Sequence, residues 1–168
     1  PSNPDLYTRT DGAMFDDQGN LWVLNAGTDL SIRILSPTGN WHILGIYTNN
    51  SNIPLQTPGE IVVDKRNSQW KWIPLCRANT GIALIQDNGT PTKSNDDKTL
   101  YRNEWFDQYN TPIRPEFIYT LAQDHDNTIW VGTSKGLFTI PASVDFMKSN
   151  KCERIVIRRN DGTDLGDY

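Results

Sequence analysis

The stretch LAQDHDNTIWVGTSKGLFTIP, residues 121–141, decides the fold class of this chain. Short apolar segments flank the polar cluster DHDNT, and a second polar break, TSKG, precedes another apolar segment. Asp, Asn and Gly tolerate the positive φ angles of tight turns, so the pattern predicts a β-hairpin followed by a third antiparallel strand. Because Asp, His, Ser and Lys also lie close together here, the stretch is a candidate for a catalytic segment, a ligand site or one unit of a repeating scaffold.

The rest of the chain favours the repeating scaffold. In three places a tryptophan follows an aspartate by six residues: Asp16 and Trp22, Asp64 and Trp70, and Asp124 and Trp130. Residues typical of β-strands precede each aspartate, and a further such segment follows each tryptophan after a short break. Gly81 and Gly136 open that segment in the second and third copies, and Gly132 precedes the break in the third. A small residue there lets the third strand start close to the neighbouring strand.

Four strands per copy, with 48 and 60 residues between successive aspartates, are typical of β-propeller blades. We therefore predict an all-β chain with about three four-stranded blades of a larger or incomplete β-propeller. The predicted blades are 11–48, 58–95 and 116–160, with an inserted loop at 95–116 and fourth strands at 41–44, 90–93 and 154–157. Pro74 removes a ladder donor from the second strand of the middle copy, so we expect a bulge or an early strand end there.

Composition narrows the classes of function. The 168 residues carry a net charge of −4, which disfavours nucleic-acid binding. No apolar segment approaches the roughly 20 residues of a membrane helix. The first residues, PSNPDLYTRTDG, lack the pattern of a signal peptide, and we expect an export signal upstream in a longer protein. Cys76 and Cys152 have no metal or redox spacing, and the sequence leaves open whether they form a disulfide.

The segment IYTLAQDHDNTIWVGTSKGLFTIP, residues 118–141, closely resembles the two-component regulator propeller repeat. That repeat has an Asp-Gly-Asn-like turn, an aliphatic-Trp-aliphatic-Gly-Thr segment and a Gly-Leu start to the third strand, which residues 124–127, 129–133 and 136–137 match. The first copy matches only in its first half, with Asn25 in place of Gly, and the middle copy departs further at 71–73.

A narrower resemblance is to the PorZ-like proteins of the Bacteroidetes. It rests on NTGIALIQDNGTPT at 79–92, on the complete repeat and on the tail RIVIRRNDGTDLGDY at 154–168. This resemblance implies an exported, non-enzymatic module in the periplasm or at the cell surface, associated with type IX secretion and with protein or glycan partners. The same repeat also builds the periplasmic sensor regions of hybrid two-component systems, so a ligand-sensing domain is the alternative.

The candidate site residues divide into core and surface. The three tryptophans at the repeated position could stack on sugars, but their shared position favours packing between blades. Trp105, in the predicted loop, is the aromatic most expected at the surface, and Thr133, Ser134 and Lys135 form the loop most expected to meet a ligand or partner. We expect no cofactor, no metal and no catalytic residue: nucleophile and phosphate motifs are absent, and neither Asp-rich turn has both the Gly and the Glu of a calcium loop.

Incomplete ring closure has one further consequence. Three blades do not close a propeller, so strand edges are left open, and open edges tend to pair. We therefore expect self-association.

Overall fold

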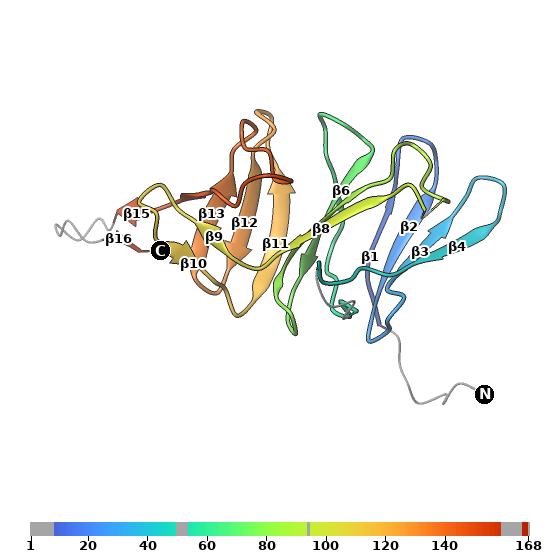
Figure 1. The fold of residues 1–168 in the computed structure, drawn as a ribbon, viewed down its shortest axis with the longest axis horizontal. Helices are drawn as coiled ribbons and strands as arrows, with labels where there is room; N and C mark the ends of the chain where they lie inside the picture. The colour runs from blue at the N-terminus through green and yellow to red at the C-terminus, as the bar shows by residue number, and fades with distance from the viewer. Residues whose placement is uncertain (1–8, 50–53, 94, 159–165, 168) are drawn as a thin grey trace.

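A computed structural model describes residues 9–49, 54–93, 95–158 and 166–167. Over these residues the chain forms strands and turns, arranged as three four-stranded and two two-stranded antiparallel sheets. Figure 1 shows the three large sheets side by side along the long axis of the molecule. Each is a simple meander in chain order, which confirms the all-β prediction.

We call the three large sheets blades 1, 2 and 3. Blade 1 contains β1 (Arg9–Phe15), β2 (Leu21–Ala26), β3 (Ile32–Leu35) and β4 (Trp41–Leu44); blade 2 contains β5 (Val62–Val63), β6 (Trp70–Leu75), β7 (Gly81–Gln86) and β8 (Lys98–Arg102); blade 3 contains β11 (Ile118–Gln123), β12 (Ile129–Thr133), β13 (Gly136–Ile140) and β14 (Glu153–Arg154). The small sheets pair β9 (Trp105–Phe106) with β10 (Pro112–Ile113), and β15 (Ile157–Arg158) with β16 (Gly166–Asp167).

The strand register shows which residues are equivalent in the three blades. Trp22 pairs with Met14 and Trp130 with Ala122, each two residues before the turn aspartate. In blade 2 the residue in this position is Trp72, which pairs with Val62. The equivalence predicted for Trp70 is therefore wrong, because the turn from Asp64 to Trp70 is two residues longer than the turn from Asp16 to Asn20.

The second half of blade 2 also differs from the prediction. Its fourth strand is β8, at 98–102, and not residues 90–93, which form turns. The predicted inserted loop at 95–116 holds β8 together with the β9–β10 hairpin. The fourth strand of blade 3 is also shorter than predicted, since β14 ends at Arg154 and Ile157 pairs with Asp167 in the small sheet. The tail residues 159–165 and 168 lie outside the described residues.

Pro74 does not end its strand early, because β6 continues to Leu75. The register between the first and second strands does shift by one residue near this point, between the Pro58–Leu75 bridge and the Val62–Trp72 pair. The same shift occurs in blade 1 at 10–12 and in blade 3 at 118–120, where there is no proline. The irregularity is therefore a feature of the blade and not a consequence of Pro74.

Two hydrophobic clusters hold the blades together. We call the side of each blade that carries Trp22, Trp72 or Trp130 its tryptophan face, and the other side its opposite face. The tryptophan face of blade 1 packs on the opposite face of blade 2, as Trp22 and Leu24 share a cluster with Ile73. The tryptophan face of blade 2 packs in the same way on blade 3, where Trp72 shares a cluster with Val131.

Candidate functional site

The tight turn between β12 and β13 carries three of the residues predicted to meet a ligand. Gly136 has φ = 93°, a conformation that favours glycine, and it closes the turn opposite Thr133. The Thr133 hydroxyl donates to the carbonyl oxygen of Gly136 at 2.7 Å and accepts from the N–H of Lys135 at 3.1 Å. Thr133 is therefore a buried turn-forming residue, whereas Ser134 and Lys135 are exposed.

Ser134 joins this turn to the segment that leads into β11. Its hydroxyl oxygen accepts from the N–H groups of Glu116 and Phe117 at 3.0 and 3.1 Å, and its own N–H donates to the Phe117 carbonyl. These bonds hold the Ser134–Lys135 turn beside the segment that follows β10.

The β9–β10 hairpin forms the other wall of the site. Its turn is built by Asp107, whose carboxylate accepts from the N–H groups of Tyr109 and Thr111 at 3.0 and 2.8 Å. Asp16 and Asp124 make the same pair of bonds at their own turns. The sequence FDQYNT at 106–111 is the signal for this hairpin that the sequence analysis missed.

Asp107 also holds the cationic side chain of Arg154 at the site. The Arg154 guanidinium donates to the Asp107 carboxylate at 3.1 Å, and both side chains are largely buried. Burial pushes the pKa of Asp107 upward, but the bonds from Thr111, Arg154 and Tyr109 outweigh this effect and leave the pKa below its ordinary value. The carboxylate therefore stays charged at neutral pH and holds the guanidinium in place.

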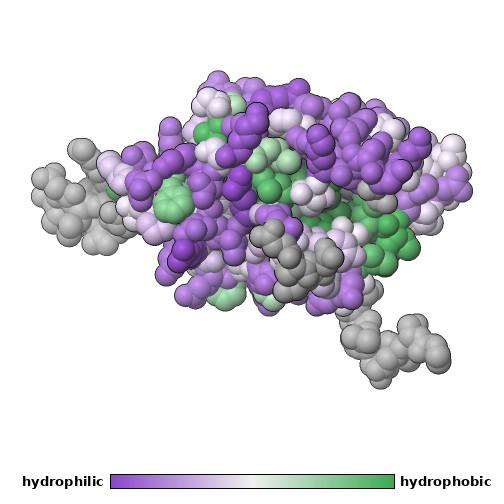
Figure 2. Space-filling model, viewed as in Figure 1, coloured by the Kyte–Doolittle hydropathy of each residue, from purple (hydrophilic) through white to green (hydrophobic). Residues whose placement is uncertain are grey.

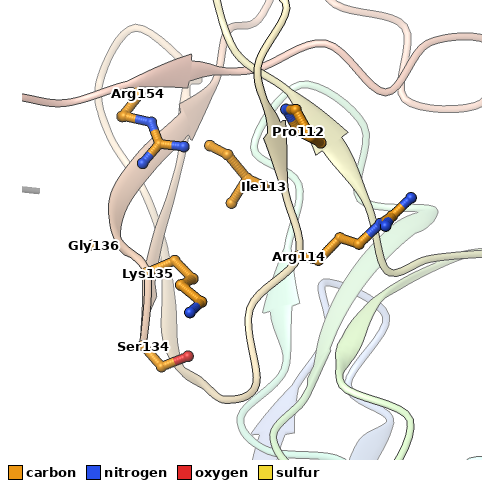
Figure 3. A pocket seen from close by; sticks show the side chains of 7 residues that line it. All are labelled: Pro112, Ile113, Arg114, Ser134, Lys135, Gly136 and Arg154. Carbon is orange, nitrogen blue, oxygen red and sulfur yellow. The ribbon is translucent and has the colours of Figure 1, made fainter.

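These elements surround a pocket of about 440 Å³, within the range of small-ligand sites. It is lined by Pro112, Ile113, Arg114, Ser134, Lys135, Gly136 and Arg154. In Figure 3 the side chains of Arg154, Ile113 and Lys135 gather around one space, while Arg114, which follows β10, extends away from it. Arg114 pairs with Glu104 at 2.5 Å. The pocket therefore has an apolar wall with cations at its rim, in a chain of net negative charge.

Trp105 is not the exposed aromatic that the sequence predicted. It is fully buried, with its ring 5.1 Å from that of Phe138, and it pairs across the hairpin with Ile113 of β10. The β9–β10 hairpin buries Trp105 in the same hydrophobic cluster as Ile113, which lines the pocket. Its indole N–H has no hydrogen-bond partner among the described residues.

The repeated aspartates and tryptophans form hydrogen-bonded pairs within the blades. The indole N–H donates to the turn aspartate at 2.8 Å from Trp22, 3.0 Å from Trp72 and 2.7 Å from Trp130. Trp70 makes no such bond to Asp64 in the described structure; its ring instead lies 5.8 Å from the guanidinium carbon of Arg66. The rings of Trp22 and Trp72 thus pack between adjacent blades, and the aspartates order the turns and orient the rings.

A cation–π contact and hydrogen bonds tie neighbouring blades together. Lys71 of blade 2 forms an almost fully buried ion pair with Asp87, and its ammonium lies 5.0 Å from the centre of the Trp22 ring of blade 1. At the next interface, Lys65 donates from its backbone N–H to the Gln123 side chain at 2.7 Å. The Gln123 amide in turn donates to Asp64 at 3.2 Å.

The cysteines and histidines do not form a site. Cys76 and Cys152 are free thiols, and burial raises the pKa of Cys152 to about 12, which keeps it protonated. Across the described ranges, no group of three His, Cys, Asp or Glu residues is arranged to hold a metal ion. No helix in the described part of the chain is long and apolar enough to cross a membrane.

Repeated four-stranded blades that pack face to face define this chain as a portion of a β-propeller. The family model described as two component regulator propeller matches residues 112–135, which run from β10 to the Ser134–Lys135 turn. Among solved structures, the chain is similar to PorZ of Porphyromonas gingivalis, described as an essential surface component of the type-IX secretion system. The TM-score is 0.74, with 23% identity over 93% of this chain and 22% of that one.

These comparisons confirm the predicted β-propeller class and the predicted resemblance to the propeller repeat and to PorZ-like proteins. The chain spans about a fifth of the length of that PorZ chain. No curated protein matches it.

Proposed function

We propose that this chain is a non-enzymatic recognition module of an exported, PorZ-like protein that takes part in type IX secretion. The propeller supplies a rigid support, and the pocket beside Lys135 supplies the contact with a protein or glycan partner. The main support for this proposal is that the residues matched by the propeller-repeat model end at Ser134 and Lys135, which line the cationic pocket.

The chemistry of the pocket favours an anionic group in the partner. Arg154 is held by Asp107, while no described residue forms an ion pair with Lys135 through its ammonium group. Ile113 and Pro112 add an apolar wall on which the ring of a sugar or an aliphatic side chain can lie. The partner class is therefore an acidic glycan or an acidic protein segment.

Binding of two probes tests the recognition role directly. Oligogalacturonate and an oligoglutamate peptide are titrated into the protein at low salt, and we expect one of them to bind. Lys135→Ala should weaken that binding about tenfold, equal to about 1.4 kcal/mol. Lys98→Ala, an exposed lysine on β8, is the matched control and should leave it unchanged. If neither probe binds, or both variants weaken binding equally, the pocket is not the recognition site.

Deletion of the gene tests the role in secretion. The surface-exposed fraction of a type IX cargo protein should fall, and cargo should accumulate in the periplasm. Unchanged cargo at the surface would refute this role.

The alternative is a ligand-sensing domain of a hybrid two-component system, favoured by the match to a two-component regulator propeller model. It predicts that deletion leaves type IX cargo in place and abolishes a transcriptional response to a glycan. The same deletion strain, analysed for cargo and for transcripts, separates the two functions.

A further inference from the structure

A second pocket lies at the outer rim of the interface between blades 1 and 2. The segment after β4 runs beside β8 there, because the side-chain amide of Asn49 bonds to both the N–H and the carbonyl oxygen of Tyr101. The pocket has a volume of about 380 Å³, and its lining includes Leu44, Gly45, Tyr47, Ile85, Asp97 and Thr99. Figure 2 shows hydrophobic side chains gathered on this side of the molecule, where β4 ends in Figure 1. The two walls thus come from blades that pack on each other within this chain.

The floor of this second pocket is apolar. Leu44 of blade 1 and Ile85 of blade 2 are buried in the hydrophobic cluster that joins the two blades. Tyr47 forms one side of the pocket and is partly exposed. Its ring is packed against Gly45, where an added Cβ would lie 2.6–2.7 Å from the Tyr47 hydroxyl and ring carbons. Only glycine at position 45 therefore leaves room for the aromatic ring to stand beside the apolar floor.

Asp97 supplies the charge of the pocket. Its Oδ1 atom is buried and has no hydrogen-bond partner among the residues that the structure describes. Asp97 also takes part in none of the ion pairs found between described residues. Buried charges in proteins are normally paired, because an unpaired charge away from water is costly. A cation bound in the pocket would offset this cost.

The charges around Asp97 also favour a cation. Asp87 and Asp96 repel the Asp97 carboxylate, and Lys71, which is already paired with Asp87, is the cation that opposes them. Three carboxylates against one ammonium leave an excess of two negative charges. Burial, followed by repulsion from Asp87, raises the pKa of Asp97 to about 6, so the carboxyl is ionised for the most part at pH 7.5.

We propose that this pocket binds an alkylammonium group, with the ammonium at the Asp97 carboxylate and the alkyl stem on the apolar floor beside Tyr47. A guanidinium fits less well, because its bidentate pairing needs both carboxylate oxygens and Oδ1 is buried. A metal ion is disfavoured too, since within the described ranges no three His, Cys, Asp or Glu residues are arranged to hold one. The pocket shares no residue with the one beside Lys135, so this proposal and the proposed function stand or fail separately.

An NMR titration tests the site. n-Pentylamine is added to the isotope-labelled protein at pH 7.5 and low salt, and we expect saturable shifts of the backbone amide signals of Gly45, Tyr47 and Thr99. n-Pentanol has the same apolar stem without the charge and should bind about tenfold more weakly or worse, because it cannot form a charged hydrogen bond. If pentylamine leaves these signals in place, or if pentanol binds as tightly, the proposal is wrong.

Two aspartate variants test the assigned charge. Asp97→Asn should weaken the binding of pentylamine about tenfold or more. Because burial penalises the charge of Asp97, the same change should stabilise the fold at pH 7.5, so weaker binding would not come from unfolding. Asp96→Asn is the matched control: it removes the same charge from an exposed neighbour outside the pocket lining and should change the affinity by about twofold at most. Equal effects of the two variants would overturn the proposal.

The pH dependence of binding gives an independent readout. An alkylamine, like the lysine side chain with its pKa of about 10.4, stays charged at neutral and mildly acidic pH, so a change in affinity reflects the pocket. The affinity should fall as the pH drops below about 6, where protonation removes the charge of Asp97. The profile of Asp97→Asn should be flat, because Asp87 is paired with Lys71 and Asp96 is exposed. A flat profile for the wild type would contradict the proposal.

A blocked tripeptide with a central lysine separates the two sources of an alkylammonium group. If the peptide shifts the same amide signals at least as strongly as pentylamine does, the ligand is a lysine side chain of a partner protein. If only pentylamine binds, the ligand is a small free amine. Both outcomes support the alkylammonium site, and absence of binding by both probes would overturn it.

Discussion

Replacing Asp16 by alanine tests the repeated unit most sharply. The Asp16 carboxylate accepts from the backbone N–H of Asn20 at 2.8 Å and from the indole N–H of Trp22 at 2.8 Å, and both contacts are buried. In Asp16→Ala these two donors lose their partner inside the protein. A buried donor without a partner costs about 1–3 kcal/mol, so the change should lower the free energy of unfolding by about 2–6 kcal/mol.

Urea denaturation followed by tryptophan fluorescence measures the effect. With a denaturant slope of about 2 kcal/mol per molar urea, a cost of about 4 kcal/mol lowers the midpoint by about 2 M. The matched variant is Asp124→Ala, which removes the same bond from Trp130. Because Trp130 is partly exposed, water can replace the carboxylate, and the midpoint should shift clearly less. Equal shifts in the two variants would refute the reasoning that burial sets the cost.

The pKa of Asp16 adds a test by pH. Burial pushes this pKa upward, but the bonds from Trp22 and Asn20 outweigh burial and lower it below its ordinary value. A carboxyl whose pKa is lower in the folded state stabilises the fold above its unfolded pKa of about 3.9 and loses that contribution as the pH falls through the folded value. The midpoint difference between the wild type and Asp16→Ala should therefore shrink below pH 4. If the midpoint difference stays constant as the pH falls to the pKa of Asp16 in the folded state, the hydrogen bonds assigned to its carboxylate are wrong.

Three further predictions concern other buried groups. Lys71→Ala should lower the free energy of unfolding by about 3–5 kcal/mol in urea titrations, because it leaves Asp87 buried without its ion-pair partner, whereas Lys71→Met combined with Asp87→Asn should cost less. Burial and the neighbouring carboxylate of Asp87 raise the pKa of Asp97 to about 6, so the free energy of unfolding of the wild type should fall as the pH rises from 4 to 7. Asp97→Asn should remove this pH dependence. At pH 7.5 the variant should be more stable than the wild type by about 1 kcal/mol, after allowance for solvent screening. Gly81→Ala should cost about 1–3 kcal/mol in the same titration, because a Cβ there would lie 2.4 Å from the Arg102 carbonyl oxygen. No change in the urea midpoint of a variant, or an unaltered pH profile for Asp97→Asn, would refute the corresponding reasoning.

The sequence predicted the candidate site only in part. Ser134 and Lys135 were predicted because they lie on a loop directly after the second strand of a blade, where loops from several propeller blades converge, and the structure places both at the pocket. Ile113 and Arg154 were missed because they come from segments about 20 residues away on either side of the turn. The β9–β10 hairpin brings Ile113 to the pocket, and the pairing of β14 with β13 brings Arg154 there. Trp105 was assigned to the surface because the polar residues around it hid the short strand that buries it.

The sequence by itself determined the strand-and-turn pattern, since turn residues and alternating apolar segments act through local backbone preferences. It also determined the recurrence of Asp before Trp, from which the propeller class follows. Tertiary structure decided which tryptophan of blade 2 bonds to Asp64, because a two-residue difference in turn length changes the register without changing the local pattern. Tertiary structure also decided which faces of the blades are covered. A face is buried only where a neighbouring sheet packs on it, and the sequence of a single strand does not show which sheet will be its neighbour.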